Sequence, residues 1–373
     1  MRSLFVRARP HFKNLRYRLW RQSAQLVSKS FCDFPTGVVE NERTFLHLEA
    51  RDHLESMEVL GPPAVVSVTP LALAFPDTLA FGERLGYILR KAVVDPQTGA
   101  VCVGHRRLLG ASVGNMWRVV GWGRLIPSLN APVTSNVEEG LAVAMPPLAY
   151  YHWLTETVPA LLFALERGEQ VAVVTTLEPL AYVLEMVEIL QSAFPEKVEC
   201  HRTDDRVRCG RLFFLTRPLE VTHPHPADVA ALQRLATVTG VSTAKETRRR
   251  IYVSRRHAPR RAYKDEVALE DLLRRRRFEI VHLERMPLAE QMATMCEAEV
   301  VVGFHGAGLT NVVWSNRGAR VVEVFLKEAF TDYYRNLAGI AGHRYGSLSA
   351  VGVTPEQLAD SILGLVDNLA TTP

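Results

Sequence analysis

The stretch Val300 to Trp314, VVVGFHGAGLTNVVW, decides the fold of the second half of this chain. An apolar run typical of a buried strand enters a glycine-rich turn, and a short helix is predicted from about Ala307. Glycines at such a junction let a ligand approach the backbone, and the free N–H groups of a helix start favour an anion. The spacing matches neither the dinucleotide fingerprint nor a P-loop, so the stretch fits a phosphate-binding loop or a plain tight turn equally well.

Strands and helices alternate on both sides of this stretch. The predicted strands cover residues 251–254, 278–283, 300–303 and 321–325. The predicted helices cover residues 265–276, 288–298 and 309–314, and a last one covers 355–369. Strands alternating with helices indicate βαβ units and a parallel sheet. We therefore predict a Rossmann-like domain over residues 245–354 and a C-terminal helix over 355–373.

The first half of the chain has a different organisation. Residues 31–135 are rich in Pro, Gly and short β-branched runs, and residues 86–108 read as a hairpin with a DPQTG turn. From about residue 141 the pattern becomes α/β. The predicted helices cover residues 150–165, 180–194 and 227–238, and the predicted strands cover 171–175 and 212–216. We predict one domain over residues 31–240, β-rich to about 135 and α/β after it.

Composition limits the class of protein. With 373 residues, 47% apolar and 23% charged, the chain is long enough for two folded α/β domains. A net charge of +4 gives no reason to expect a nucleic-acid partner. The five cysteines are odd in number and form no C-x-x-C pair, which argues against a disulfide framework and a cysteine-ligated zinc.

An N-terminal basic arm, residues 1–30, holds eight Lys or Arg residues and no Asp or Glu. Bulky apolar residues interleave with these charges, so the arm fits either an anionic membrane surface or a solvated tail. It lacks the features of a secretory signal, and no apolar run in the chain approaches the ~18 residues of a membrane span. The expected location is the cytoplasm, with the inner membrane face as a peripheral site.

Polar residues follow or occupy the predicted strands of the second half. His305 and Asn311 flank the glycine-rich turn, where their side chains can reach a ligand. Glu323 lies in an otherwise apolar strand, and a buried acid needs a partner, either ligand hydroxyls such as those of a ribose or an arginine. Ser254 and Arg255 end another strand. The arginines at 255, 256, 260 and 261 allow two interpretations. They bind a diphosphate and neutralise its charge without a metal ion, or they form a solvated loop.

His152 and Glu156 are four residues apart in a predicted helix, so they share one face. Such a pair can take a proton from a hydroxyl, although the same spacing is common in ordinary helix-surface pairs.

Three motifs, in this order and separation, resemble glycosyltransferase family 61 in its bacterial form. They are Y-H-W-x-x-E at residues 151–156, S-R at 254–255 and G-x-H-G-A-G-L-T-N at 303–311. Arg261, Glu266, the pair Glu290-Gln291 and Glu323 also fit, whereas Asp265 departs from the family's Asn. The resemblance covers about residues 150–345.

The resemblance implies a GT-B fold, two Rossmann-like domains facing across a cleft, here with an N-terminal β-rich extension. It implies inverting transfer from a nucleotide-sugar to a hydroxyl of a glycan or glycoconjugate, without metal or other cofactor. Cell-surface polysaccharide synthesis, such as that of a capsule, is the expected setting. Glu156 or His152 would be the base. The donor-binding residues would be Ser254, Arg255, Arg261, His305, Gly306, Ala307, Gly308, Leu309, Thr310, Asn311 and Glu323. A nucleotide-sugar epimerase or a non-catalytic nucleotide-binding protein of the same fold are the alternatives.

Overall fold

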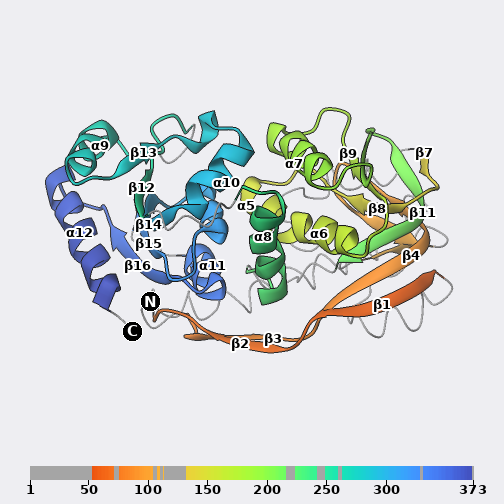
Figure 1. Cartoon of the computed structure of the whole chain (residues 1–373), viewed down its shortest axis with the longest axis horizontal. Coiled ribbons are helices and arrows are strands. Elements are labelled where there is room, and N and C mark those ends of the chain that lie inside the picture. Colours follow the sequence, from red (N-terminus) through yellow and green to blue (C-terminus); the bar gives the residue numbers. More distant parts are fainter. Residues whose placement is uncertain are drawn as a thin grey trace, which may run out of the picture. The chain divides into compact units, whose positions relative to one another are not determined.

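The structure, a computed structural model, describes residues 53–70, 75–103, 107–109, 112, 132–215, 223–241, 248–258, 263–327 and 331–371 (Figure 1). The chain divides into two compact units. Unit 1 comprises Met1–Pro63, Gly82–Leu148 and His152–Thr222, and unit 2 comprises Ala64–Phe81, Ala149–Tyr151 and His223–Pro373. The basic arm, residues 1–30, and Arg261 lie outside the described residues.

Unit 2 is built on a five-stranded sheet in the order β13-β12-β14-β15-β16, and every neighbouring pair is parallel. Its strands are β12 (Arg249–Val253), β13 (Glu279–Val281), β14 (Ala298–Phe304), β15 (Arg320–Phe325) and β16 (Arg344–Ser349). Its helices are α8 (Pro226–Val238), α9 (Glu266–Arg275), η2 (Leu283–Arg285), α10 (Leu288–Cys296), η3 (Ala307–Trp314), α11 (Tyr333–Ala341) and α12 (Pro355–Thr371). The predicted parallel sheet is confirmed, whereas β16 and α11 were not predicted.

Helices cover both faces of this sheet. Figure 1 shows α9 and α12 on one side and α10 and α11 on the other. Alternate residues of the central strands, such as Val300, Val302 and Val322, form one core with Leu269 of α9 and Ile362 of α12. Because both faces are buried, the strands are continuous apolar runs, as expected of a parallel sheet.

A hairpin from the predicted N-terminal domain belongs to unit 2. Its strands β2 (Ala64–Ser67) and β3 (Thr78–Phe81) are antiparallel and precede most of unit 1 in the sequence. Gly339 of α11 lies against it: a Cβ there would be 2.5 Å from Val68 Cγ1. Phe81 packs edge-on against His223 before α8, at 5.3 Å between ring centroids. Unit 2 therefore begins again at residue 223, before the boundary predicted at 240–245, because the hairpin and α8 pack with the C-terminal elements.

Arg335 of α11 holds the hairpin through hydrogen bonds and an ion pair. Its side chain is fully buried and donates hydrogen bonds to the carbonyls of Thr69 and Pro76, the latter at 2.9 Å. It also forms an ion pair with Asp77 at 3.2 Å.

Unit 1 contains a nine-stranded mixed sheet in the order β10-β9-β8-β11-β4-β5-β6, with β1 paired to β4 and β7 to β11. Its strands are β1 (Leu54–Gly61), β4 (Arg84–Val94), β5 (Val101–Val103), β6 (Arg107–Leu108), β7 (Val133–Val137), β8 (Leu141–Ala144), β9 (Val171–Thr175), β10 (Val198–Arg202) and β11 (Arg206–Leu215). Its helices include η1 (Trp153–Thr157), α6 (Val158–Glu166) and α7 (Ala181–Ala193), and α5 (Tyr150–His152) joins the two units.

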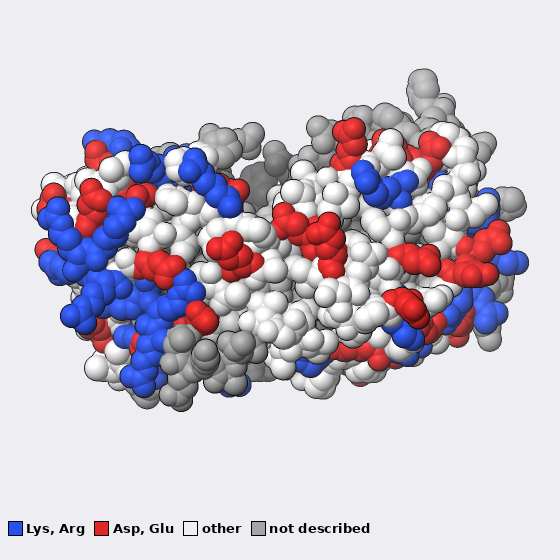
Figure 2. All heavy atoms as spheres, turned by 45° about the horizontal axis from the view of Figure 1, so that its top comes forward, with Lys and Arg blue, Asp and Glu red and all other residues white. Residues whose placement is uncertain are grey.

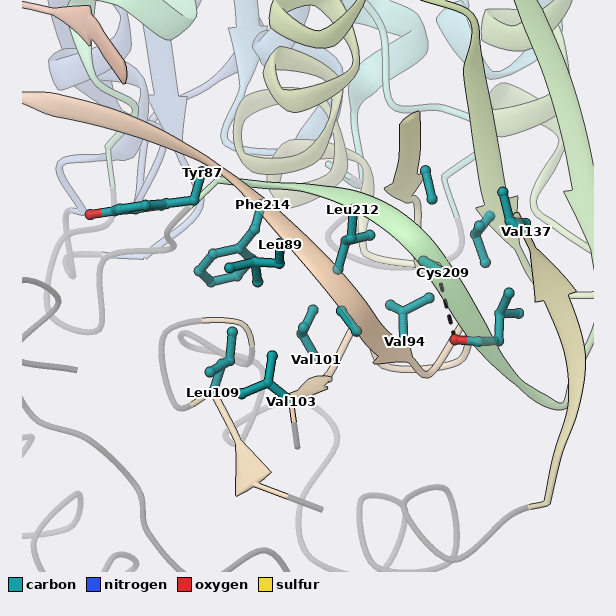
Figure 3. Close-up of a cluster of buried hydrophobic side chains, with 14 of the residues drawn as sticks. Tyr87, Leu89, Val94, Val101, Val103, Leu109, Val137, Cys209, Leu212 and Phe214 are labelled. Carbon is teal, nitrogen blue, oxygen red and sulfur yellow. Dashed lines mark hydrogen bonds between the residues drawn. The ribbon is translucent and has the colours of Figure 1, made fainter. Parts of the chain in front are cut away.

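The predicted hairpin is confirmed, because β4 and β5 are antiparallel across the turn at residues 95–99. The β-rich part and the α/β part of the predicted domain are joined in one sheet. Strand β4 pairs antiparallel with β11, with Leu89 opposite Leu212, so the early strands and the α/β part share one sheet. Leu89, Val101, Leu212 and Phe214 meet in a common core (Figure 3). The early strands of unit 1 therefore complete the sheet of its α/β part.

The four described cysteines, Cys102, Cys200, Cys209 and Cys296, are free. Burial raises the pKa of the Cys209 thiol to about 12, which makes it unreactive at neutral pH. No described helix has both the length and the apolar character needed to cross a membrane.

We expect Arg335→Ala to destabilise the protein by about 2–4 kcal/mol, because it opens a cavity and removes the hydrogen bonds to the carbonyls of Thr69 and Pro76. Asp77→Asn should cost less than about 1 kcal/mol, since the carboxylate is exposed and surface ion pairs contribute little. Denaturant unfolding of both variants measures the difference. Equal losses would mean that the ion pair, and not the bonds to the carbonyls, holds the hairpin.

Candidate functional site

The parallel register of unit 2 brings the second and third motifs to one edge of the sheet. Val253 of β12, Gly303 of β14 and Glu323 of β15 lie side by side. Arg255 and His305 follow the first two strands at their carboxyl ends. Ligands of open α/β sheets bind at this edge, so these two motifs of the sequence form one candidate site.

The guanidinium of Arg255 lies directly on the backbone of Gly306. A Cβ at Gly306 would be 1.8 Å from Arg255 Nη1 and 2.6 Å from its Cζ. The φ of Gly306, 170°, is extended and open to any residue, so the contact and not the backbone conformation requires glycine here. Any other residue would displace Arg255 from the glycine-rich turn.

Two buried acids of α9 hold the chain at Ser254 and Arg255. Glu266 accepts a hydrogen bond of 2.6 Å from the backbone N–H of Arg255. Glu270 accepts one of 2.7 Å from the hydroxyl of Ser254, which is itself buried. The side chain of Ser254, predicted to bind the donor, thus points to α9 and positions the loop.

Glu266 matched the family pattern without an assigned role, and Glu270 was missed. The signal was present in the sequence, because residues 266 and 270 lie one turn apart and flank the apolar Leu269. An acid beside the buried stripe of an amphipathic helix points to a buried polar partner.

Glu323 sits in a buried hydrogen-bonded chain. Its carboxylate is fully buried and accepts hydrogen bonds from His305 Nδ1 at 2.5 Å and Tyr345 Oη at 2.6 Å. Burial raises the pKa of Glu323, while the two hydrogen bonds oppose that rise. The imidazole also stacks on Phe325, with ring centroids 5.4 Å apart. No arginine in the described part of the chain pairs with Glu323, although an arginine partner was one of the two predicted alternatives; the acid instead binds His305 and Tyr345.

The glycine-rich motif divides into an accessible and a buried part. Ala307 is exposed, and His305 and Gly308 are partly exposed. The remaining predicted donor-binding residues of this motif, Gly306, Leu309, Thr310 and Asn311, are buried. The predicted short helix is the 3₁₀ helix η3, and the hydroxyl of Thr310 donates to the carbonyl of Ala307 at 2.7 Å within it. The accessible residues of the motif are thus His305 and the first two residues of η3, Ala307 and Gly308.

Asn311 ties the loop to the first motif. Its Oδ1 accepts a hydrogen bond of 2.6 Å from Tyr150 Oη, and its Nδ2 donates one of 2.9 Å to Gln291. The next residue, Tyr151, packs edge-on against Tyr334, whose ring also contacts His305. The first tyrosines of the Y-H-W-x-x-E region therefore belong with the candidate site in unit 2.

The chain enters unit 1 at His152, where the remaining part of that motif lies. His152 Nδ1 and Glu156 Oε1 are 2.5 Å apart, and both side chains are partly exposed. The prediction that they share one helix face is confirmed. The turn that holds them, η1, is a π-helix and not the expected α-helix, and the N–H of Val158 donates to the carbonyl of Trp153. Single π turns inside α-helices are frequent at functional sites.

Two further arginine clusters of the sequence, residues 248–250 and 274–277, lie at the opposite edge of the unit 2 sheet. Arg249, at the start of β12, pairs with Glu279 and Glu297. The guanidinium of Arg250 lies 4.4 Å from the ring centroid of Phe278. Figure 2 shows Lys and Arg side chains gathered where α9 and α12 lie, at the left of the view. These clusters are therefore separate from the carboxyl edge that carries Arg255.

Comparison with known proteins agrees with this geometry. Residues 150–322, which span from Tyr150 past the glycine-rich turn, match the family model for glycosyltransferase 61. EGF domain-specific O-linked N-acetylglucosamine transferase of Drosophila melanogaster is 30% identical over 96 residues. That match covers 25% of this chain and 18% of the relative, so it spans less than a fifth of the relative's length. The part of the chain that carries all three motifs, residues 150–322, belongs to glycosyltransferase family 61.

Proposed function

We propose that this protein transfers a sugar from a nucleotide-sugar donor to a hydroxyl of a glycan or glycoconjugate acceptor. The observation that carries the proposal is the guanidinium of Arg255 on Gly306, at the carboxyl edge of a parallel sheet and beside the His305–Glu323 pair. A cation, an oriented imidazole and a helix start at one edge suit a diphosphate.

The donor diphosphate would bind at the accessible part of the turn. Arg255 supplies a charged donor group, and the first N–H groups of η3 have no intrahelical partner. His305 donates through Nδ1 to Glu323, which leaves the Nε2 lone pair to accept a hydrogen bond from a hydroxyl of the donor. In this proposal Arg255, His305, Ala307 and Gly308 face the donor. The buried residues Ser254, Gly306, Leu309, Thr310, Asn311 and Glu323 support the loop. Arg261 stays a donor-binding residue predicted from the sequence.

The reaction would be a single displacement with inversion at the anomeric carbon. The acceptor oxygen forms a bond to that carbon as the bond to the diphosphate breaks, and the diphosphate leaves with the electron pair. The acceptor proton passes to the His152–Glu156 pair, whose Glu156 carboxylate or His152 imidazole serves as the base. We propose a GT-B arrangement for the two units, so that this pair and the donor meet. The positive charge of Arg255 would replace a metal ion at the leaving group.

Three further points stay predictions from the sequence. They are a contact of residues 1–30 with an anionic membrane, a cytoplasmic location, and a role in cell-surface polysaccharide synthesis.

Product analysis tests the proposed function. A panel of nucleotide-sugars is screened by thermal shift, because a bound donor raises the melting temperature. The stabilising donors are then incubated with a panel of 4-nitrophenyl glycosides as acceptors. Sugar-extended glycoside together with free nucleoside diphosphate is the expected result. An epimerised nucleotide-sugar, or binding without any product, would overturn the proposal in favour of an epimerase or a non-catalytic binding protein.

We expect Arg255→Ala to weaken binding of the selected nucleoside diphosphate by about 2–3 kcal/mol, since a charge-assisted contact is lost. Isothermal titration calorimetry measures this loss. Arg275→Ala is the control, because Arg275 is an exposed arginine at the end of α9 in the same unit. Equal affinities for Arg255→Ala and wild type would remove Arg255 from the site.

Glu156→Gln should lower kcat by about 10²–10⁴ while the donor affinity stays close to that of wild type, because a base acts on the acceptor. Glu188→Gln, an exposed acid on α7, should leave kcat unchanged. If instead Glu156 only stabilises η1, its variant loses melting temperature with no selective loss of turnover. Measurements of melting temperature, donor affinity and kcat on one preparation separate these results.

Transfer should persist in excess EDTA, because the arginine-based account needs no bound metal. Rates measured before and after chelation, with a known metal-dependent transferase as the positive control, test this expectation. Activity lost in EDTA and restored by Mn²⁺ or Mg²⁺ would contradict the proposed role of Arg255 at the leaving group.

A further inference from the structure

The amino edge of the unit 2 sheet carries arginines that the candidate site does not use. Strands β12 and β13 are neighbours and begin at Arg249 and Glu279, so the two arginine clusters meet at this edge. Arg249 pairs with Glu279, and the guanidinium of Arg250 lies over the ring of Phe278, the residue that follows the second cluster. We call this surface the basic edge. It consists of Arg248, Arg249, Arg250, Arg274, Arg275, Arg276 and Arg277.

Acids neutralise only part of the basic edge. Arg249, Arg274 and Arg276 form ion pairs with neighbouring carboxylates. Three other arginines are exposed and have no ion pair with any residue that the structure describes. They are Arg248, Arg275 and Arg277. Figure 2 shows a broad area of Lys and Arg side chains where α9 and α12 lie. The surface therefore keeps positive charge that the fold itself does not balance.

Arg250 lies within this positive charge. Its side chain is half-buried, and its Nε and Nη2 have no hydrogen-bond partner among the described residues. The pKa of Arg250 is lowered, first by burial and then by the positive charge of Arg320, while Asp367 and Glu299 oppose that change. An anion bound at this edge would offset the repulsion between the two guanidinium groups.

The local structure does not require all of these arginines. The dipole of α9 favours positive charge in its last turn, which accounts for Arg274 and Arg275. Arg277 lies beyond that turn and has a φ of 64°, in the left-handed region. The N–H of Phe278 bonds to the carbonyl of Leu273, and glycine is the usual residue before it in a helix ending of this kind. The turn itself therefore favours glycine over arginine at residue 277.

The residues at this surface favour phosphate headgroups over nucleic acid. None of the exposed large hydrophobic residues in the described part of the chain is aromatic, and Phe278 is buried under Arg250. Proteins that bind single strands stack bases on aromatic rings, and proteins that read a duplex insert a helix or a strand pair into a groove. The basic edge presents only the end of α9 and the starts of two strands. Guanidinium groups at such a surface suit the phosphates of anionic lipid.

We propose that the basic edge of unit 2 binds a membrane surface that exposes anionic phospholipid headgroups. Arg248, Arg275 and Arg277 contact the headgroup phosphates. The residues proposed to hold the donor lie at the carboxyl edge of the same sheet, so a membrane at the amino edge does not cover Arg255. This inference goes beyond sugar transfer, and it concerns a surface other than residues 1–30.

Co-sedimentation of the full chain with lipid vesicles at low salt tests the proposal. The vesicles contain about three parts of phosphatidylcholine to one part of phosphatidylserine. Wild type should bind them and should not bind vesicles of phosphatidylcholine alone. A triple variant, Arg248→Gln with Arg275→Gln and Arg277→Gly, should partition about ten- to a hundredfold more weakly, because each arginine near the surface adds to the attraction. Its melting temperature should not fall, since glycine suits the φ of residue 277. If it does fall, Arg275→Glu alone should still weaken binding.

A matched control removes three exposed arginines outside the basic edge. It combines Arg208→Gln on β11, Arg234→Gln on α8 and Arg285→Gln on η2. The control has the same net charge as the triple variant and should partition within about twofold of wild type, because charges far from the lipid are screened. Equal weakening in both variants would mean that binding follows net charge, and undiminished binding of the triple variant would place the contact elsewhere. Either result overturns the proposal.

Two further outcomes also decide against the membrane. Wild type that does not bind the phosphatidylserine vesicles overturns the proposal outright. Wild type that binds a single-stranded oligonucleotide through the basic edge, but not the vesicles, would assign this surface to nucleic acid instead. Vesicle binding needs no donor, acceptor or turnover, so its result stands whether or not the protein transfers a sugar.

Discussion

In unit 2, Val253, Gly303 and Glu323 lie in register across three parallel strands, and the candidate site depends on this register. A shift of one residue in β14 would turn every side chain of that strand to the opposite face. Gly303 would then no longer face Val253, whose Cβ is 3.3 Å from the position that a Cβ of Gly303 would occupy. The close contact of these strands therefore fixes where Arg255 and His305 leave the sheet, and so fixes the distance between them.

Buried carboxylates hold the site once the strands have placed it. Glu266 and Glu270 bind the chain at Arg255 and Ser254, and Glu323 binds His305 and Tyr345. An acid removed from water destabilises the fold unless hydrogen bonds replace its hydration, and each of these acids has such bonds. Because of these hydrogen bonds, the loops have little conformational freedom before a ligand binds. A diphosphate bound there need not order Arg255 or His305, which lowers the entropy cost of binding.

The sequence predicts local features of this protein better than its long-range contacts. The glycine-rich turn, the strand before Ser254 and the His152–Glu156 spacing are local patterns, and the structure places each as expected. The hairpin at residues 64–81 has no local feature that assigns it to unit 2. Its place depends on Gly339 and Arg335, more than 250 residues away in the chain. The motif at residues 303–311 also depends on long-range contacts. Only the packed structure shows that Asn311 faces Tyr150 and not a ligand.

The Y-H-W-x-x-E motif joins two functions at a single peptide bond. Tyr150 and Tyr151 pack with the glycine-rich turn of unit 2, and His152 and Glu156 belong to unit 1. The hydrogen bond between Asn311 and Tyr150, within unit 2, is thus two residues from His152 along the chain. Adjacent Cα atoms are about 3.8 Å apart whatever the two units do, so Tyr151 keeps the start of the base segment attached to the donor side. If Glu156 is the base, as proposed, this covalent link ties the start of its segment to the residues proposed to hold the donor, and the π turn of η1 brings Glu156 Oε1 to 2.5 Å from His152 Nδ1.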